Sequence, residues 1–173
     1  MKPHEGHRKR AKQTLRVRVV TVSTSRWALK KGNQPFADEA GDAAEEEVRK
    51  AGHTFTGRGL VSDEAGMLQD EVSRFLTGRD DVLLFTGGTG VSSRDITIET
   101  VRPFFEKELP GFGELLRRVS FDEIGSAAML TRATAGVAKG KLIVCMPGSP
   151  GAVRTALRST MAEFPHILFV ARS

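Results

Sequence analysis

Several residue types and patterns that mark whole classes of protein are scarce or absent in this chain. Its 173 residues include one cysteine, Cys145, which excludes an internal disulfide; its apolar surroundings predict a buried thiol. The four histidines, His4, His7, His53 and His166, have no ligand spacing with one another or with Cys145, which argues against a zinc site. No Gly-x-Ser-x-Gly motif is present, so the chain lacks a nucleophile elbow.

Long apolar runs are also missing. No segment approaches the roughly 20 apolar residues that span a membrane. The first apolar segment is a short alternating one, unlike the apolar block of a signal peptide. We therefore expect a cytoplasmic protein with no membrane partner.

The positive charge of the chain is concentrated at its start. The net charge is +5, but residues 1–18 hold seven of the 26 Lys and Arg and one of the 21 acids, which leaves the remainder at −1. This distribution predicts a basic tail over residues 1–14 and argues against a nucleic-acid-binding surface on the domain itself. Length and composition predict one globular domain over residues 15–173.

Apolar runs of strand length alternate with segments of helical period. The expected strands cover residues 15–22, 54–61, 82–85, 141–146 and 167–170. The expected helices cover residues 42–51 with Asp42 as cap, 64–77, 97–109, 113–119, 122–134 and 150–164. Pro103 fits poorly inside the third of these and suggests a kink or a later start. The alternation predicts an α/β fold, namely a three-layer, mostly parallel, doubly wound sheet.

The central apolar strand leads into a glycine-rich loop. Thr86, Gly87, Gly88, Thr89 and Gly90 follow Val82–Phe85, and Arg94 and Asp95 precede the next helical segment. Glycines let backbone N–H groups approach an anion closely. The loop is not a P-loop, because no Lys-Ser/Thr follows, and it lacks the third glycine of a dinucleotide fingerprint. A phosphate site is one interpretation and a tight strand-to-helix turn is the other.

Four polar or glycine-rich loops follow expected strands, at residues 23–27, 62–64, 86–95 and 147–150. In a parallel sheet the carboxyl ends of the strands share one edge, so we expect one cleft there. Arg94 would bind an anion in it, and Asp63 and Asp95 would hold Mg²⁺. The alternative for both aspartates is helix capping. Ser149 and Pro150 fit an N-cap and a first helical residue.

Four motifs in this order resemble the MoaB/MogA family of molybdenum-cofactor biosynthesis proteins, from about Leu15 to the C-terminus. They are Thr86-Gly-Gly-Thr-Gly90 with Arg94-Asp-x-Thr97, Pro110-Gly-Phe-Gly-Glu114, Ile124-Gly-Ser-Ala-Ala-Met-Leu-Thr-Arg-Ala133 and Pro147-Gly-Ser-Pro150.

The resemblance implies a molybdopterin-binding fold and Mg²⁺-dependent transfer of AMP from ATP to molybdopterin, with release of pyrophosphate. It assigns Asp63 and Asp95 as catalytic or metal-associated carboxylates. The substrate-binding positions that it implies are Ser23, Thr86, Gly87, Gly88, Thr89, Gly90, Arg94, Thr131, Arg132, Pro147, Gly148 and Ser149. It also implies a homo-oligomer, trimer or hexamer, and a molybdate-insertion protein as a further partner.

One departure from the family pattern bears on activity. Many relatives have Thr-Pro-Glu where this chain has Thr97-Ile98-Glu99, and the isoleucine resembles the MoaB branch, for which the resemblance leaves catalysis an open question. The intact Arg94-Asp95 pair favours an enzyme. A non-catalytic molybdopterin-binding or scaffold protein and another phosphate-ligand enzyme of the same fold stay open.

Overall fold

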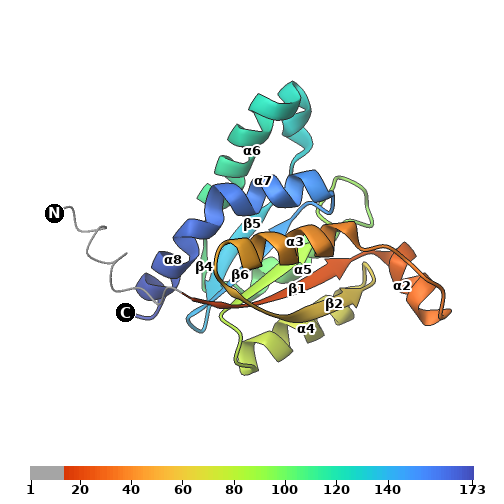
Figure 1. Ribbon diagram of the computed structural model, residues 1–173, viewed down its shortest axis with the longest axis horizontal. Coiled ribbons are helices and arrows are strands. Elements are labelled where there is room, and N and C mark those ends of the chain that lie inside the picture. The colour runs from red at the N-terminus through yellow and green to blue at the C-terminus, as the bar shows by residue number, and fades with distance from the viewer. Residues whose placement is uncertain (1–13) are drawn as a thin grey trace.

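The structure is a computed structural model that describes residues 14–173 (Figure 1). The expected basic tail, residues 1–14, lies outside the described residues except for its last position, so the tail boundary stays a prediction. Within residues 14–173, no helix combines the length and the apolar character needed to cross a bilayer.

A six-stranded sheet in the order β2-β1-β3-β6-β5-β4 forms the centre of the fold. Its strands are β1 (Arg16–Val22), β2 (Thr54–Val61), β3 (Val82–Thr86), β4 (Lys107–Glu108), β5 (Thr134–Ala138) and β6 (Lys141–Met146). The first four in spatial order are parallel, whereas β5 pairs antiparallel with both β6 and β4. The longer helices are α2 (Thr24–Lys31), α3 (Glu39–Lys50), α4 (Ala65–Thr77), α6 (Pro110–Ile124), α7 (Pro150–Thr160) and α8 (Phe164–Ala171). The short ones are α5 (Thr97–Val101) and the 3-10 helices η1 (Arg102–Phe104), η2 (Gly125–Leu130) and η3 (Met161–Glu163).

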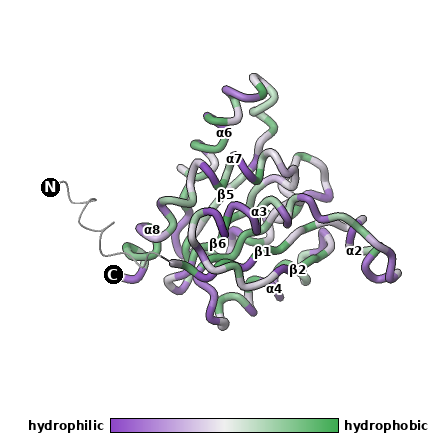
Figure 2. The backbone as a smooth tube through the Cα atoms, in the orientation of Figure 1, coloured by the Kyte–Doolittle hydropathy of each residue, from purple (hydrophilic) through white to green (hydrophobic). Residues whose placement is uncertain are grey.

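Both faces of the sheet are covered, because alternate residues of each central strand point to opposite sides. Val82 and Leu84 of β3 belong to the cluster under α3, α6, α7 and α8, which we call the first core cluster. Leu83 and Phe85 belong to the cluster under α4 and α5, which we call the second core cluster. Figure 2 shows hydrophobic residues along the central strands and hydrophilic ones on the outer turns of α3. The predicted three-layer, doubly wound α/β fold is confirmed. Cys145 is buried as expected, and burial raises the pKa of its thiol well above the usual range.

The expected strand at 167–170 is wrong, because this segment belongs to helix α8. Phe164 and Leu168, one helical turn apart, are buried against the first core cluster, whereas Val170 is 53% exposed. A run of four apolar residues is too short to distinguish the period of a helix from that of a strand. The conformation of this segment is therefore set by packing against the sheet, which buries one face of the helix.

The segment between β3 and β6 also differs from the prediction. The expected helix 97–109 ends at Val101, and Pro103 lies in η1 before the short strand β4. The two expected helices at 113–119 and 122–134 are replaced by the single helix α6, then η2, then β5. β5 consists of small residues, and a Cβ on Gly136 would lie 2.2 Å from the ring of Phe105. The strand was missed because three of its five residues, Ala135, Gly136 and Ala138, are of types depleted in strands.

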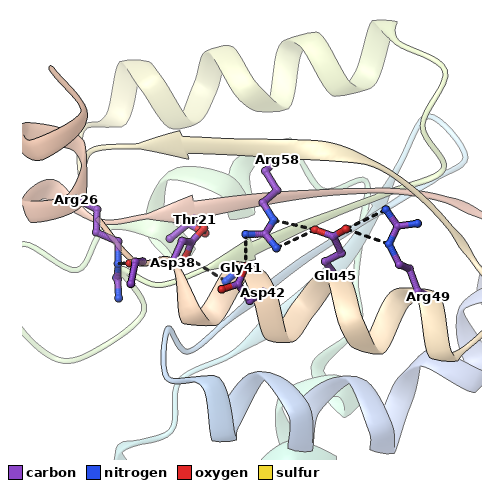
Figure 3. A network of polar contacts seen from close by, with 9 residues as sticks. Thr21, Arg26, Asp38, Gly41, Asp42, Glu45, Arg49 and Arg58 are labelled. Carbon is purple, nitrogen blue, oxygen red and sulfur yellow. Dashed lines mark hydrogen bonds and ion pairs between the residues drawn. The ribbon is translucent and has the colours of Figure 1, made fainter. Parts of the chain in front are cut away.

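Helix α3 begins three residues before the predicted position. Its N-cap is Asp38, whose carboxylate accepts hydrogen bonds from the Gly41 N–H and the Thr21 hydroxyl. Asp42, the predicted cap, instead pairs with Arg58 of β2 at 2.6 Å (Figure 3). The same guanidinium bonds Glu45, which ties α3 to β2. The contact of Asp38 with Thr21 lies close to the carboxyl end of β1, whereas Arg58 lies opposite Val19 in the middle of that strand.

Candidate functional site

A cleft of about 330 Å³ opens at the carboxyl edge of the parallel strands. We call it the edge cleft. Its lining comes from the segments that follow β1, β2 and β3, namely Val22, Ser23, Thr24, Ser25, Asp63, Gly88, Ser92, Arg94 and Asp95. Three of the four segments that were expected to converge as loops therefore do so, and five predicted site residues line the same cleft. The expected loop at 23–27 is wrong in conformation, because Ser23 caps helix α2 and residues 24–27 form its first turn.

Asp63 is held in the edge cleft by Thr24, the first residue of α2. The Thr24 hydroxyl and backbone N–H donate to Asp63 Oδ2 at 2.7 and 3.1 Å. In return, the Asp63 N–H donates to the Thr24 hydroxyl at 3.2 Å. The N-cap of α4 is Glu64, and no side chain caps that helix. The capping alternative for Asp63 is therefore wrong: its carboxylate belongs to the cleft.

Asp95 is fixed by its own loop. Its Oδ2 accepts a hydrogen bond from the Ser92 N–H at 2.9 Å, and it lies so close to Gly90 that a Cβ there would be 2.8 Å away. The N-cap of α5 is Ile96, which makes no side-chain cap. Asp95 thus shapes the loop before α5 and does not cap the helix.

The glycine loop adopts a backbone conformation that requires glycine. Gly87 and Gly88 have φ of 104° and 62°, in the left-handed region. A Cβ on Gly88 would lie 2.3 Å from Thr97 Oγ1 and 2.7 Å from Asp63 Oδ1. Thr97 holds the loop from behind, since its hydroxyl donates to Gly87 O at 2.9 Å and its N–H donates to Gly88 O. Asp63 therefore lies directly over a loop whose backbone is fixed.

Arg94 supplies a positive charge to the edge cleft. Its backbone N–H donates to the Ser92 hydroxyl, while its exposed guanidinium has no ion pair with any residue in the described part of the chain. A guanidinium that is not already paired can bind phosphate oxygens bidentately. The edge cleft therefore combines a cation for phosphate with two carboxylates that could hold a divalent metal.

The other predicted site residues lie beside or behind this cleft. Gly148 packs on the glycine loop, since a Cβ there would be 3.0 Å from Gly87 Cα; Pro147 and Ser149 flank it. Ser149 accepts a hydrogen bond from Ala152 N–H at the start of α7, as its predicted capping role requires. The remaining residues, which do not line the cleft, are Thr86, Gly87, Thr89, Gly90, Thr131 and Arg132.

Arg132 connects the segment after η2 to the glycine loop. Its guanidinium donates to Gly90 O at 2.7 Å and pairs with Glu99 of α5. Burial by itself would raise the pKa of Glu99, but the hydrogen bond from Arg132 and its charge lower it overall. Thr131, next to it, donates its backbone N–H to Ala128 O. Arg132 thus holds the backbone of the glycine loop and does not itself line the cleft.

Two carboxylates in one cleft fit a cation that binds together with its substrate. In each of them Oδ2 accepts a hydrogen bond, whereas Oδ1 accepts none from any described residue. No group of three or more potential metal-ligating side chains exists within residues 14–173. Mg²⁺ commonly uses one or two protein carboxylates and takes its other ligands from phosphate and water. The donor set is suited to that mode of binding and not to an all-protein metal site.

Thr24 and Thr97 are the functional candidates that the sequence reasoning missed. Thr97 was noted only as part of a motif, although its spacing after the glycines was a usable signal. Thr24 is 39 residues from Asp63, so no local pattern links them.

Fold and site together define an α/β protein whose strand-end cleft is suited to an anionic, phosphate-bearing ligand.

Residues 18–166 match the family described as "Probable molybdopterin binding domain". The chain is 40% identical to molybdenum cofactor biosynthesis protein B of Bacillus anthracis over 166 residues, 94% of each chain. It is 39% identical to the molybdopterin adenylyltransferase of Pyrococcus furiosus, over 97% of this chain and 98% of that protein. The crystal structure of the tungsten cofactor synthesizing protein MoaB from P. furiosus superposes with a TM-score of 0.82 at 36% identity, covering 94% of this chain and 100% of that one. The chain belongs to this molybdopterin-binding family, and the resemblance to MoaB/MogA proteins is confirmed.

Proposed function

We propose that this protein is a molybdopterin adenylyltransferase, which transfers AMP from ATP to molybdopterin in the biosynthesis of molybdenum or tungsten cofactor. The observation that carries the proposal is the placement of Asp63 and Asp95 in the same cleft as Arg94. The similarity to a named molybdopterin adenylyltransferase extends over nearly the whole chain.

The reaction forms a bond between a phosphate oxygen of molybdopterin and the α-phosphorus of ATP. The bond from that phosphorus to the oxygen bridging to the β-phosphate breaks, and pyrophosphate leaves with the electron pair. Positioning and charge neutralisation account for most of the rate in such transfers, so no protein nucleophile is needed. Arg94 and the backbone amides of Gly88–Gly90 would bind phosphate oxygens, since the Gly87 N–H already donates to Met146 O, and Pro147, Gly148 and Ser149 would border a second phosphate site.

Mg²⁺ would be held by the carboxylates of Asp63 and Asp95, and when bound it would neutralise phosphate charge. Thr24 would keep the Asp63 carboxylate in its orientation in the cleft. Ser23 would line the site, and Thr131 and Arg132 would contribute at its margin, Arg132 through the Gly90 backbone.

The test is Mg²⁺-dependent release of pyrophosphate from ATP in the presence of molybdopterin. We expect Asp95→Asn and Asp63→Asn to lose at least ~100-fold in rate while remaining folded, which corresponds to about 2.7 kcal/mol of transition-state stabilisation. Asp122→Asn is the matched control, because Asp122 is an exposed carboxylate of α6 that does not line the edge cleft. Turnover equal to wild type in both site variants would refute the assignment.

A non-catalytic molybdopterin-binding protein is the alternative, and binding of molybdopterin by wild type without pyrophosphate release would establish it. The feature that raised this alternative is Ile98 in place of the proline found in many relatives. Ile98 is buried in the second core cluster and does not line the edge cleft. This placement supports the enzyme reading, because the departure changes packing behind the site.

We further propose a homo-oligomer, trimer or hexamer, located in the cytoplasm and passing its product to a molybdate-insertion protein. Helix α6 projects from the body of the molecule (Figure 1). It and η2 expose large apolar side chains, among them Phe121 at 59% and Met129 at 83%. Exposed apolar clusters of this kind mark interaction surfaces. Sedimentation velocity should give a multiple of the 18.8 kDa chain, and Phe121→Glu with Met129→Glu should reduce it toward the monomer.

A further inference from the structure

The sheet has one long edge strand. Its two edges are β2, which spans eight residues, and β4, which spans two. A long edge strand presents a row of backbone N–H and C=O groups to which another chain can pair, whereas a very short one presents few. From Thr54 to Gly59 the residues of β2 are exposed or half-buried, in contrast to the fully buried β3. The β2 edge is therefore the side of the sheet that could receive a further strand.

The pairing of β2 with β1 shows which backbone groups of β2 point outward. The Ser23 N–H, just after β1, donates to Val61 O at 2.9 Å, so the backbone groups of Val61 face β1. Because these groups alternate in direction along a strand, those of Leu60 and Arg58 point away from β1. In the described part of the chain, no backbone group bonds to either residue on that side. The register shift of β2 lies before Arg58, so this half of the strand is regular.

A pocket of about 300 Å³ opens over the same half of β2, and we call it the β2-edge pocket. It is lined by residues 58–61 of β2 and by side chains of β1, α2 and α4. Gly59 leaves room there, since an added Cβ would lie 3.3 Å from the guanidinium of Arg18. The outward backbone groups of β2 thus border an open pocket.

The β2-edge pocket carries an excess of positive charge. Its charged side chains are Arg18, Lys30, Arg58, Arg74, Asp70 and Glu71. The buried Glu71 is shared by two guanidiniums, that of Arg18 at 3.3 Å and that of Arg74 at 3.0 Å. One carboxylate therefore balances two cations, and Asp70 is the only other acid in the lining.

Lys30 and Trp27 of α2 also line the pocket. The Lys30 ammonium lies 5.6 Å from the centroid of the Trp27 ring and has no ion pair within residues 14–173. Arg58, by contrast, is already paired with Asp42 and Glu45 of α3 (Figure 3). Lys30 is thus the cation of the pocket that is ready to pair with a carboxylate.

The charge of the pocket selects the occupant of this edge. A second copy that paired its own β2 here would bring the same cations together, and like charges across paired strands are destabilising. The N-terminal segment of this chain is disfavoured for the same reason, because residues 1–13 hold five Lys and Arg and one acid. An extended chain rich in carboxylates meets both complementary charge and unpaired backbone groups.

We propose that the β2 edge binds an extended acidic segment of a partner protein, which adds a strand to the sheet beside Arg58 and Leu60. Backbone hydrogen bonds would supply the affinity, and the cations of the pocket would select carboxylates. The β2-edge pocket shares no lining residue with the edge cleft. It also lies at the sheet edge opposite β4, whereas α6 packs against β5 beside β4. The inference is therefore independent of the proposed function and of the proposed oligomer surface.

Trp27 gives the test a built-in reporter, because it is the only tryptophan of the chain and it lines the pocket. The probe for the full-length protein is an eight-residue peptide of alternating glutamate and threonine, blocked at both ends. Two derivatives carry N-methyl groups, one on every glutamate and the other on every threonine, and a peptide of alternating lysine and threonine reverses the charge. Lys30→Glu tests the cation, and Lys31→Glu is the matched control, an exposed neighbour outside the pocket.

We expect the glutamate peptide to change the Trp27 emission saturably and the lysine peptide to leave it unchanged. One N-methylated peptide should bind within about twofold of the parent and the other at least about tenfold more weakly, because only alternate amides of an added strand face β2. Lys30→Glu should weaken binding at least about fivefold and Lys31→Glu less than about twofold.

Four outcomes would overturn the proposal. Unchanged emission with the glutamate peptide would refute the site, and equal binding of both N-methylated peptides would refute strand addition. Unchanged binding to Lys30→Glu, or equal binding of the lysine peptide, would refute selection by charge. Emission that changed with protein concentration in the absence of peptide would assign the edge to a second copy.

Discussion

Replacing Gly88 by alanine should destabilise the protein through two separable effects. Gly88 has φ of 62°, and a residue with a Cβ pays about 1–2 kcal/mol in this region. The added Cβ would also lie 2.3 Å from Thr97 Oγ1 and 2.7 Å from Asp63 Oδ1, so both side chains must move. Losing the buried bond from Thr97 to Gly87 O costs about 1–3 kcal/mol. The free energy of unfolding should fall by about 2–5 kcal/mol.

Two other glycines separate these effects. Gly52 has φ of 78° but nothing within 4 Å of an added Cβ, so Gly52→Ala should cost only the conformational term of about 1–2 kcal/mol. Gly111 lies in α6 with open space and no positive φ, so Gly111→Ala should be neutral or stabilising by up to about 1 kcal/mol.

Urea unfolding at fixed pH, followed by circular dichroism, measures all three variants on one scale. The order of stability should be Gly111→Ala, then Gly52→Ala, then Gly88→Ala. Pyrophosphate release should fall only in Gly88→Ala, because only that change displaces Asp63. If Gly88→Ala were no less stable than Gly52→Ala, the reasoning that the loop is locked against Thr97 and Asp63 would be refuted.

Two further predictions concern single side chains. Thr24→Val removes the hydroxyl that donates to Asp63 and should lower kcat/KM about fivefold. A fivefold loss corresponds to about 1 kcal/mol of transition-state stabilisation, as expected for an exposed hydrogen bond to a charged group. Thr24→Ser keeps the hydroxyl and should therefore retain the wild-type rate and Mg²⁺ dependence. Equal loss of rate in both variants would contradict a role of the Thr24 hydroxyl in positioning Asp63. Burial lowers the pKa of His53 from 6.5, and its Nδ1 accepts the Leu15 N–H at 3.5 Å. Because the unfolded chain then takes up the proton first, the free energy of unfolding should fall as the pH drops below about 6.5. His53→Gln should flatten that slope in urea titrations between pH 7.5 and 5.5, and an unchanged slope would assign it to other groups.

The central part of the fold was predictable because its signals are local. Val82–Phe85 is too short and too apolar for anything but a buried strand in this context, and the glycines after it fix where the chain turns. Ser149 and Pro150 likewise mark a helix start through their own backbone chemistry. The predictions were wrong where such signals are missing. Segment 167–170 is too short to show a period, and three of the five residues of β5 are alanine or glycine, which are depleted in strands.

The sequence by itself determined the α/β class, the glycine loop and the position of each candidate carboxylate in a segment that follows a strand. Tertiary structure decided which groups meet there. The pairing of Thr24 with Asp63 and of Arg132 with Gly90 joins residues 39 and 42 positions apart. The closure of Thr97 over Gly87 depends equally on how α5 is packed. Local preferences act over a few residues, whereas these contacts exist only after parallel strands have brought their ends to one edge.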